Sequence, residues 1–108
     1  MTDFTIDDEQ GGVTSISTFP VDPARQRELA ELLTSAAEEL LRHEPGFIAC
    51  GILSGVDGTQ VVNYARWESE EAMRTMIAKP EIRERMAAAW ALSKPDPRRF
   101  TVESVHVP

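Results

Sequence analysis

Two side chains on one short stretch of the sequence could do chemistry together, the amide of Asn63 and the indole of Trp67. The stretch is rich in β-branched and aromatic residues and follows an Asp57-Gly58 turn, which indicates a strand. Side chains alternate along a strand, so Asn63 and Trp67 face the same way, roughly 13 Å apart. Ala65 lies between these two hydrogen-bond donors. We therefore predict a shallow notch that is wide enough for a flat organic molecule.

Each of the chemically reactive residues also has a simpler explanation in packing or in structure. A Trp at the end of a strand is more often a packing residue, whereas an Asn inside a β-rich strand is disfavoured and needs a partner if buried, which favours function for Asn63. His43, at a helix end, suits a surface role. His106, near the C-terminus, is interpreted as structural, with general base as the minority hypothesis. Cys50 is interpreted as a small apolar core residue.

Composition excludes several classes of protein. The 108 residues suit one domain, and 18 acidic against 11 basic residues give a net charge of −7, which disfavours binding to nucleic acid. A single cysteine rules out an intrachain disulfide and a thiolate metal cluster. No apolar run approaches the length of a membrane span, and the N-terminus does not resemble a secretory signal. The expectation is a protein of the reducing cytoplasm that does not bind membranes.

The pattern of apolar residues predicts an α+β protein with the element order β-α-β-β-α-β. Residues 1–12 read as a flexible acidic arm and residues 13–108 as a single domain. Strands are predicted over 13–19, 47–53, 59–67 and 100–107, with a long helix from an Asp22-Pro23 start to about residue 42, a helix capped by Ser69, and another from about residue 81. This order is typical of a ferredoxin-like antiparallel sheet with helices on one face.

The strands carry apolar residues on both faces. The apolar residues predicted on one face are Ile48, Ile52, Val62 and Tyr64, and those predicted on the opposite face are Phe47, Leu53 and Val61. Both faces of the sheet are then expected to be buried. Face-to-face packing of two sheets would provide that cover, so we predict a two-fold symmetric homodimer.

Four stretches of the sequence resemble the antibiotic biosynthesis monooxygenase family of dimeric α+β barrels, and more narrowly the actinorhodin-pathway type of quinone-forming (anthrone) monooxygenase. The resemblance covers nearly the whole chain after the acidic arm. The Pro-Gly-Phe and Trp-x-Ser pieces occur throughout the superfamily and support the fold, whereas the Asn-x-x-x-Trp strand supports the monooxygenase. The stretches are Thr18-Phe19-Pro20-Val21-Asp22, Pro45-Gly46-Phe47, Asp57-Gly58-Thr59 and the segment from Asn63 to Glu70.

The resemblance implies oxidation of an anthrone-like or phenolic polyketide to a quinone, with molecular oxygen as co-substrate and without flavin, haem or metal. Asn63 would hydrogen-bond the keto oxygen as it acquires charge, and Trp67 would orient the rings. Close relatives have a tyrosine where this chain has Met73, which cannot donate a proton. A helix arginine of those relatives corresponds to Arg83 or to Arg85.

Four further residues, Met73, Met76, Met86 and Trp90, are predicted to be core or to line the pocket for a small aromatic substrate. Other enzyme classes are disfavoured. Gly51, Gly55 and Gly58 surround a hairpin rather than a phosphate-binding turn, and residues 70–90 contain no histidine to hold a haem. The alternative to an enzyme is a non-catalytic binding protein for small aromatics or polyketides in a biosynthetic pathway, which the residue at position 73 favours.

Overall fold

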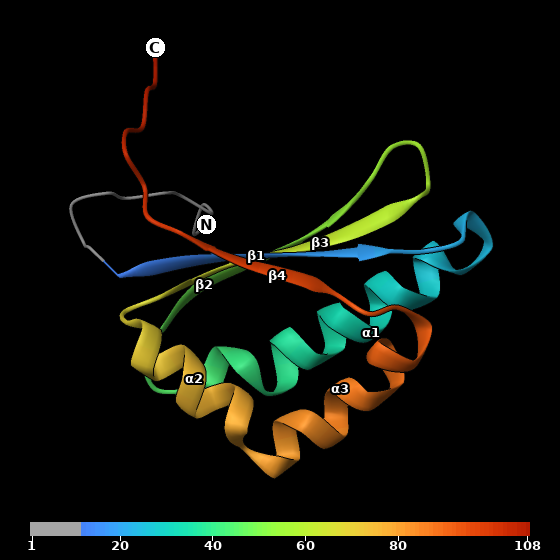
Figure 1. Ribbon diagram of the computed structural model, residues 1–108, viewed down its shortest axis with the longest axis horizontal. Helices are drawn as coiled ribbons and strands as arrows, with labels where there is room; N and C mark the ends of the chain where they lie inside the picture. The colour runs from blue at the N-terminus through green and yellow to red at the C-terminus, as the bar shows by residue number, and fades with distance from the viewer. Residues whose placement is uncertain (1–11) are drawn as a thin grey trace.

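The chain is described over residues 12–108 by a computed structural model, in which a four-stranded antiparallel sheet carries all its helices on one face (Figure 1). The strand order is β2-β3-β1-β4. The strands are β1 (Val13–Pro20), β2 (Phe47–Ser54), β3 (Gln60–Trp67) and β4 (Asp96–Phe100), and the α-helices are α1 (Gln26–Glu39), α2 (Glu70–Ala78) and α3 (Pro80–Leu92). The predicted α+β, ferredoxin-like fold is confirmed. The arm predicted over 1–12 lies outside the described residues, except for Gly12.

A side-chain cap is found at both predicted helix starts, but the first cap begins a 3₁₀ turn, Pro23–Arg25, and α1 follows it at Gln26 without a side-chain cap of its own. The carboxylate of Asp22 accepts a hydrogen bond from the backbone N–H of Ala24 at 2.8 Å, and the Ser69 hydroxyl accepts one from the N–H of Ala72 at 3.0 Å. The long helix predicted to continue to residue 42 is shorter. Leu40 has φ −123° and ψ −61°, outside helical values, so α1 ends at Glu39 and a separate 3₁₀ turn, Leu41–His43, follows.

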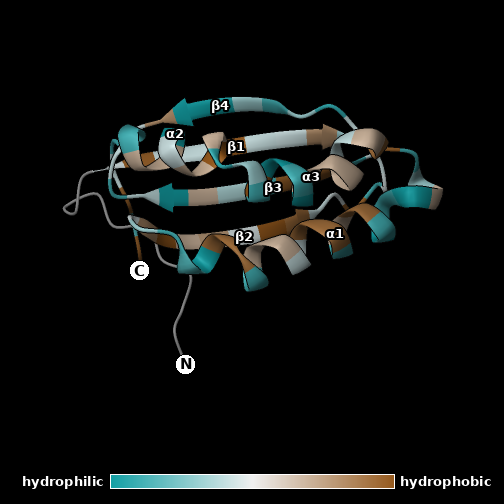
Figure 2. Cartoon of the chain, turned by 90° about the horizontal axis from the view of Figure 1, so that it is seen from below, coloured by the Kyte–Doolittle hydropathy of each residue, from teal (hydrophilic) through white to brown (hydrophobic). Residues whose placement is uncertain are grey.

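The core lies between the sheet and the helices. Its fully buried side chains include Phe19, Leu29, Leu33, Val61, Trp67 and Ile82. Viewed from the helix side in Figure 2, α1 runs along β2, whereas α2 and α3 lie toward β1 and β4.

A close approach at Gly46 sets the position of α2 against the end of the sheet. Gly46 has φ +84°, and its carbonyl accepts a hydrogen bond from the N–H of Glu68 at 2.8 Å. A Cβ placed at this glycine would lie 2.6 Å from the Cβ of Ala72 in α2. The Pro-Gly-Phe stretch therefore needs glycine both for its backbone conformation and for its contact with α2.

The last strand differs from the prediction. Residues 100–107 were predicted as a strand after a proline loop, but β4 spans Asp96–Phe100 and residues 101–108 form no strand. Pro97 is tolerated because β4 is an edge strand and lies opposite Ser17 of β1, where one side of the strand has no neighbour. Phe100 already pairs with Thr14, next to the first residue of β1, so β1 leaves no partner for residues further along.

The predicted faces of β2 also need correction. Ile52 was grouped with Val62, and Leu53 with Val61, but an irregularity between Phe47 and Ala49 shifts the alternation. Ile52 pairs with Asn63 on the helix side, and Leu53 pairs with Val62 on the outer face. A bulge of this kind cannot be recognised from alternation alone.

The outer face of the sheet is only partly covered. Leu53 is 55% exposed and Phe100 is 46% exposed, whereas Thr14 and Arg66 on the same face are buried. The chain after β4 leaves on the side of the sheet away from the helices (Figure 1). The expected burial of both faces is thus incomplete in a single chain, and the homodimer stays a prediction.

Candidate functional site

A pocket of about 540 Å³ lies between the sheet and the pair α2 and α3. Strands and helices contribute different surfaces. The strands provide Ser15, Ser17, Phe19, Asn63, Pro97 and Arg99; the helices provide Met73, Ile77, Met86 and Trp90; and the loop before β4 provides Lys94 and Pro95. Most of this lining is apolar, with a few polar groups on the strands, as is typical of sites for small organic molecules.

Strand register places Asn63 at one side of this pocket. Asn63 on β3 pairs with Ser17 on β1, and Ser17 pairs with Pro97 on β4, so these three residues form one row across the helix-facing side of the sheet. The neighbouring row contains Ala65, Ser15 and Arg99. The pocket therefore extends from Asn63 across β1 and β4.

The Asn63 amide is oriented by a thiol on the next strand. Cys50 Sγ donates a hydrogen bond to Asn63 Oδ1 at 3.2 Å. Burial raises the pKa of Cys50 to about 11, so the thiol stays protonated and remains a donor at neutral pH. Because the Asn63 oxygen is engaged, its NH₂ group is what this side chain offers to a ligand. Cys50, expected to be a simple core residue, is half-buried and contacts the site.

Trp67 lies on the same face of β3 as Asn63, as alternation predicts, but it packs in the core beside the pocket. Its side chain is 1% exposed and meets Phe47 edge to face, with ring centroids 5.4 Å apart and planes at 87°. It does not line the pocket, and Ala65 between the two predicted site residues is itself buried. The hollow beside Asn63 runs across the sheet and not along β3, where the notch was expected.

The other predicted residues divide between the pocket and its surroundings. Met73, Met86 and Trp90 line the pocket, whereas Met76 is buried in the core. The two candidate arginines make different contacts. The Arg83 guanidinium lies 6.0 Å from the centroid of the Trp90 ring, while Arg85 forms an ion pair with Glu39 of α1.

Sequence reasoning missed several lining residues, notably Ser15, Ser17, Lys94 and Arg99. The two serines could have been found, because they alternate with Phe19 on one face of the first strand as Asn63 does on the third. The two cations, Lys94 and Arg99, have no comparable signal in the sequence. Their place depends on the pairing of β4 with β1, which no local pattern reveals.

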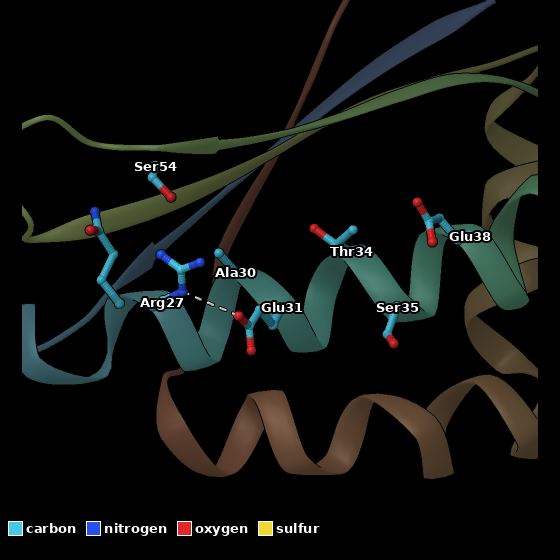
Figure 3. Close-up of a pocket in the computed structure, with 8 residues that line it drawn as sticks. Arg27, Ala30, Glu31, Thr34, Ser35, Glu38 and Ser54 are labelled. Carbon is cyan, nitrogen blue, oxygen red and sulfur yellow. Dashed lines mark hydrogen bonds and ion pairs between the residues drawn. The ribbon is translucent and has the colours of Figure 1, made fainter.

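A second hollow, of about 640 Å³, lies along the outer side of α1 (Figure 3). Its lining is polar, and its charged residues partly neutralise one another, as the 3.3 Å ion pair between Arg27 and Glu31 shows. The side-chain amide of Gln26 is also engaged, because it donates a hydrogen bond to the backbone carbonyl of Gly55 at 2.8 Å. None of the residues predicted to act in a site lines this hollow.

No helix among residues 12–108 is both long and apolar enough to cross a membrane. Within the same residues, His, Cys, Asp and Glu side chains do not gather in groups of three that could hold a metal ion.

The fold and the site define a ferredoxin-like α+β protein with a largely apolar pocket between sheet and helices. Residues 12–88 match the family described as antibiotic biosynthesis monooxygenase, and the chain belongs to that family. The recognition made from the four sequence stretches is thereby confirmed.

Individual relatives agree with this assignment. Tetracenomycin-F1 monooxygenase of Streptomyces glaucescens is 40% identical over 84 residues, 78% of this chain and 75% of the relative. The crystal structure of the ActVA-Orf6 monooxygenase of Streptomyces coelicolor, in complex with nanaomycin D, matches with a TM-score of 0.83 and 38% identity over 93% of this chain and 95% of that one. SnoaB of Streptomyces nogalater, described as a cofactor-independent oxygenase, matches with a TM-score of 0.75 and 28% identity over 88% and 96% of the two chains.

Proposed function

We propose that this protein is a cofactor-independent monooxygenase that oxidises an anthrone-like or phenolic polyketide to a quinone with molecular oxygen. The observation that carries the proposal is a largely apolar pocket in which the oriented amide of Asn63 is a hydrogen-bond donor. Support also comes from the relatives, which include a monooxygenase acting on tetracenomycin F1, a monooxygenase binding nanaomycin D and a cofactor-independent oxygenase.

The reaction balances without a further oxidant. One methylene carbon loses two hydrogens and gains one oxygen atom of O₂ as a carbonyl, while the second oxygen atom leaves as water. Deprotonation of the methylene gives an anion whose charge lies largely on the keto oxygen. The anion passes one electron to O₂, the resulting radicals combine to form a C–O bond, and cleavage of the O–O bond gives the quinone.

The protein's contribution is to make the anion accessible. The Asn63 NH₂ group donates a hydrogen bond to the keto oxygen as negative charge develops there. This hydrogen bond is strongest when the charge on the oxygen is fully developed. The methionines and Trp90 exclude water around the rings, which increases the energy of the hydrogen bond. Trp67 acts indirectly in this proposal, because it is buried against Phe47 and supports the strand that carries Asn63.

Oxygen uptake with dithranol as the anthrone tests the proposal, in metal-chelated, air-saturated buffer. The wild type should exceed the rate in buffer alone, and Asn63→Ala should lower kcat about 100-fold. Asn63→Asp offers a matched control, since it keeps the shape but replaces the donor by an acceptor and should be as slow as Asn63→Ala. A wild-type rate equal to that of buffer would overturn the proposal. Circular dichroism confirms that each variant is folded.

A non-catalytic binding role is the second candidate function. It is favoured by the lack of a general base among the lining residues that the structure describes. Among the described lining residues none carries a carboxylate or an imidazole, and Met73 stands where the resemblance to the family implies a tyrosine. In the monooxygenase proposal the methylene proton therefore passes to solvent water at the pocket opening. Tight binding of dithranol without oxygen uptake above buffer would favour the binding role.

We also propose that two copies associate through the outer face of the sheet. The exposed Leu53 and Phe100 are apolar, and their burial would complete the cover that the helices give to the other face. Leu53→Glu should convert a dimer to a monomer in light scattering, whereas Val56→Glu, in the exposed hairpin turn, should not. A monomeric wild type would exclude this association.

A further inference from the structure

Three methionines of α2 and α3 are almost equally buried but lie in different surroundings. Met73, Met76 and Met86 are 7%, 8% and 8% exposed. Met73 of α2 and Met86 of α3 line the pocket, whereas Met76 does not. A molecule in the pocket therefore meets two of these thioethers, although exposure to bulk solvent ranks all three together.

The two lining methionines belong to a different layer of the fold from Asn63. They lie on helices, and Asn63 lies on the sheet that these helices cover (Figure 1). In an anthrone the keto carbon and the methylene carbon occupy opposite positions of the middle ring. A ligand whose keto oxygen contacts Asn63 thus directs its methylene carbon away from β3, into the part of the pocket that other elements line, α2 and α3 among them.

The proposed oxidation passes through a hydroperoxide on the former methylene carbon, which gives the quinone when it loses water. A thioether can react with this hydroperoxide first. The sulfur bonds to the outer oxygen, the O–O bond breaks, and the proton of the outer oxygen passes to the oxygen that stays on carbon. The products are methionine sulfoxide and a hydroxyl group on the ring, so the sulfur is oxidised and the peroxide is reduced.

We propose that Met73 and Met86 are sites of oxidation by hydroperoxides of aromatic ligands, and that Met76 is not. For its natural oxidant the inference rests on the proposed function, and it adds a modification of the same site. Each sulfoxide places a polar group in an apolar lining, which weakens the binding of aromatic rings. The proposed oxygenase thus inactivates itself in proportion to the number of its turnovers.

The thiol of Cys50 is a slower target for the same oxidant. It is half-buried, hydrogen-bonds to Asn63 and is not among the residues that line the pocket. Burial raises the pKa of Cys50 to about 11, and a protonated thiol is a much weaker nucleophile than a thiolate. The methionines of the pocket are therefore oxidised before Cys50.

Peptide mass spectrometry after treatment with cumene hydroperoxide, a small aromatic hydroperoxide, tests the proposal without any turnover. Trypsin places the three methionines on separate peptides, residues 67–74, 75–83 and 86–98, because a proline follows the lysine within each of the last two. In the folded protein Met73 and Met86 should be oxidised roughly tenfold faster than Met76, since access determines the susceptibility of methionine. In urea the three should react at equal rates. Fragment masses distinguish oxygen on Met86 from oxygen on Trp90.

Oxidation during turnover is measured in a separate experiment with dithranol, in the presence of catalase and superoxide dismutase. Sulfoxide should accumulate on the same two peptides as oxygen is consumed. Oxygen uptake above buffer without sulfoxide on either peptide would overturn the inference and leave the proposed function standing. Selective oxidation by cumene hydroperoxide without oxygen uptake would support the modification site and exclude the oxygenase.

Variants connect the modification to ligand binding, with each protein compared before and after cumene hydroperoxide. Fluorescence titration with anthraquinone-2-carboxamide should show that wild-type affinity falls about tenfold on treatment, as expected for a polar group in an apolar site. Met73→Leu combined with Met86→Leu should keep its own affinity, whereas Met76→Leu should lose affinity as the wild type does. Oxidation of Met76 as fast as the other two in the folded protein, or an equal loss of affinity in the double variant, would overturn the inference.

Discussion

Cys50 and Asn63 lie diagonally across neighbouring strands, and the thiol of the first donates to the amide oxygen of the second at 3.2 Å. The contact exists because the bulge at the start of β2 turns Cys50 to the helix side, where Asn63 also points. A residue with no charge at neutral pH thereby determines which end of the Asn63 amide is offered to the pocket.

Removing the thiol should reduce catalysis without removing the amide. Cys50→Ala leaves Asn63 free to rotate, so we expect kcat for dithranol oxidation to fall roughly tenfold, the cost of one neutral hydrogen bond. Cys50→Ser, which keeps a donor, should retain most of the activity. Oxygen uptake measures both variants, and equal loss in the two would argue that packing around the thiol matters more than its hydrogen bond.

The raised thiol pKa makes stability depend on pH in the alkaline range. The folded protein holds the Cys50 proton up to a pKa of about 11, whereas the unfolded chain loses it near the ordinary value of 9.0. The unfolded state therefore binds fewer protons between these values, and stability falls as pH rises through this window, by up to roughly 2 kcal/mol. Urea unfolding at pH 8, 9, 10 and 11 measures this loss. The corresponding curve for Cys50→Ala should lack this component.

The two arginines of α3 should differ in their effect on ligand binding. Arg83 lies over the ring of Trp90, a lining residue, and Arg85 pairs with Glu39 on α1. Arg83→Met should weaken binding of an aromatic probe about threefold by freeing the indole, as expected for a cation–π contact of about 0.5–1 kcal/mol. Arg85→Met should leave the dissociation constant unchanged. Fluorescence titration with anthraquinone-2-carboxamide compares them, and the reverse ranking would make Arg85 the relevant residue.

Gly46 should tolerate substitution less well than Gly58, although both have φ +84°. Alanine at either position has an unfavourable backbone conformation, which costs about 1 kcal/mol or more. At Gly46 the added methyl also meets Ala72 at 2.6 Å, whereas at Gly58 the nearest atom belongs to the Pro23 ring at 3.2 Å. We expect Gly46→Ala to lower the free energy of unfolding more than Gly58→Ala. Denaturant unfolding of the pair measures the difference, and equal losses would mean that backbone strain alone decides.

Trp67→Phe separates support of the strand from direct action on the substrate. The indole is buried, so its replacement should lower stability by about 1–3 kcal/mol through lost packing. In the indirect role proposed here, kcat of the folded variant should stay within a few-fold of wild type. A loss of kcat as large as that of Asn63→Ala, with stability retained, would show that the indole acts on the substrate itself.

Local patterns in the sequence were sufficient for the class of fold and for one side of the site. Alternation along β3 correctly put Asn63 and Trp67 on one face, and Asp22 and Ser69 cap helices as their residue types predict. These features depend on residues a few positions apart. The chemistry of a strand face or a helix cap is therefore visible before any folding is considered.

Tertiary structure decided which members of that face meet the pocket. Asn63 borders the hollow and Trp67 is covered by Phe47, a difference that depends on which side chains pack above each residue. Lys94 and Arg99 reach the site only because β4 pairs with β1, which is far away in the sequence. Strand register, the bulge in β2 and the packing of helices on the sheet are set by contacts between distant segments, so alternation alone could not predict them.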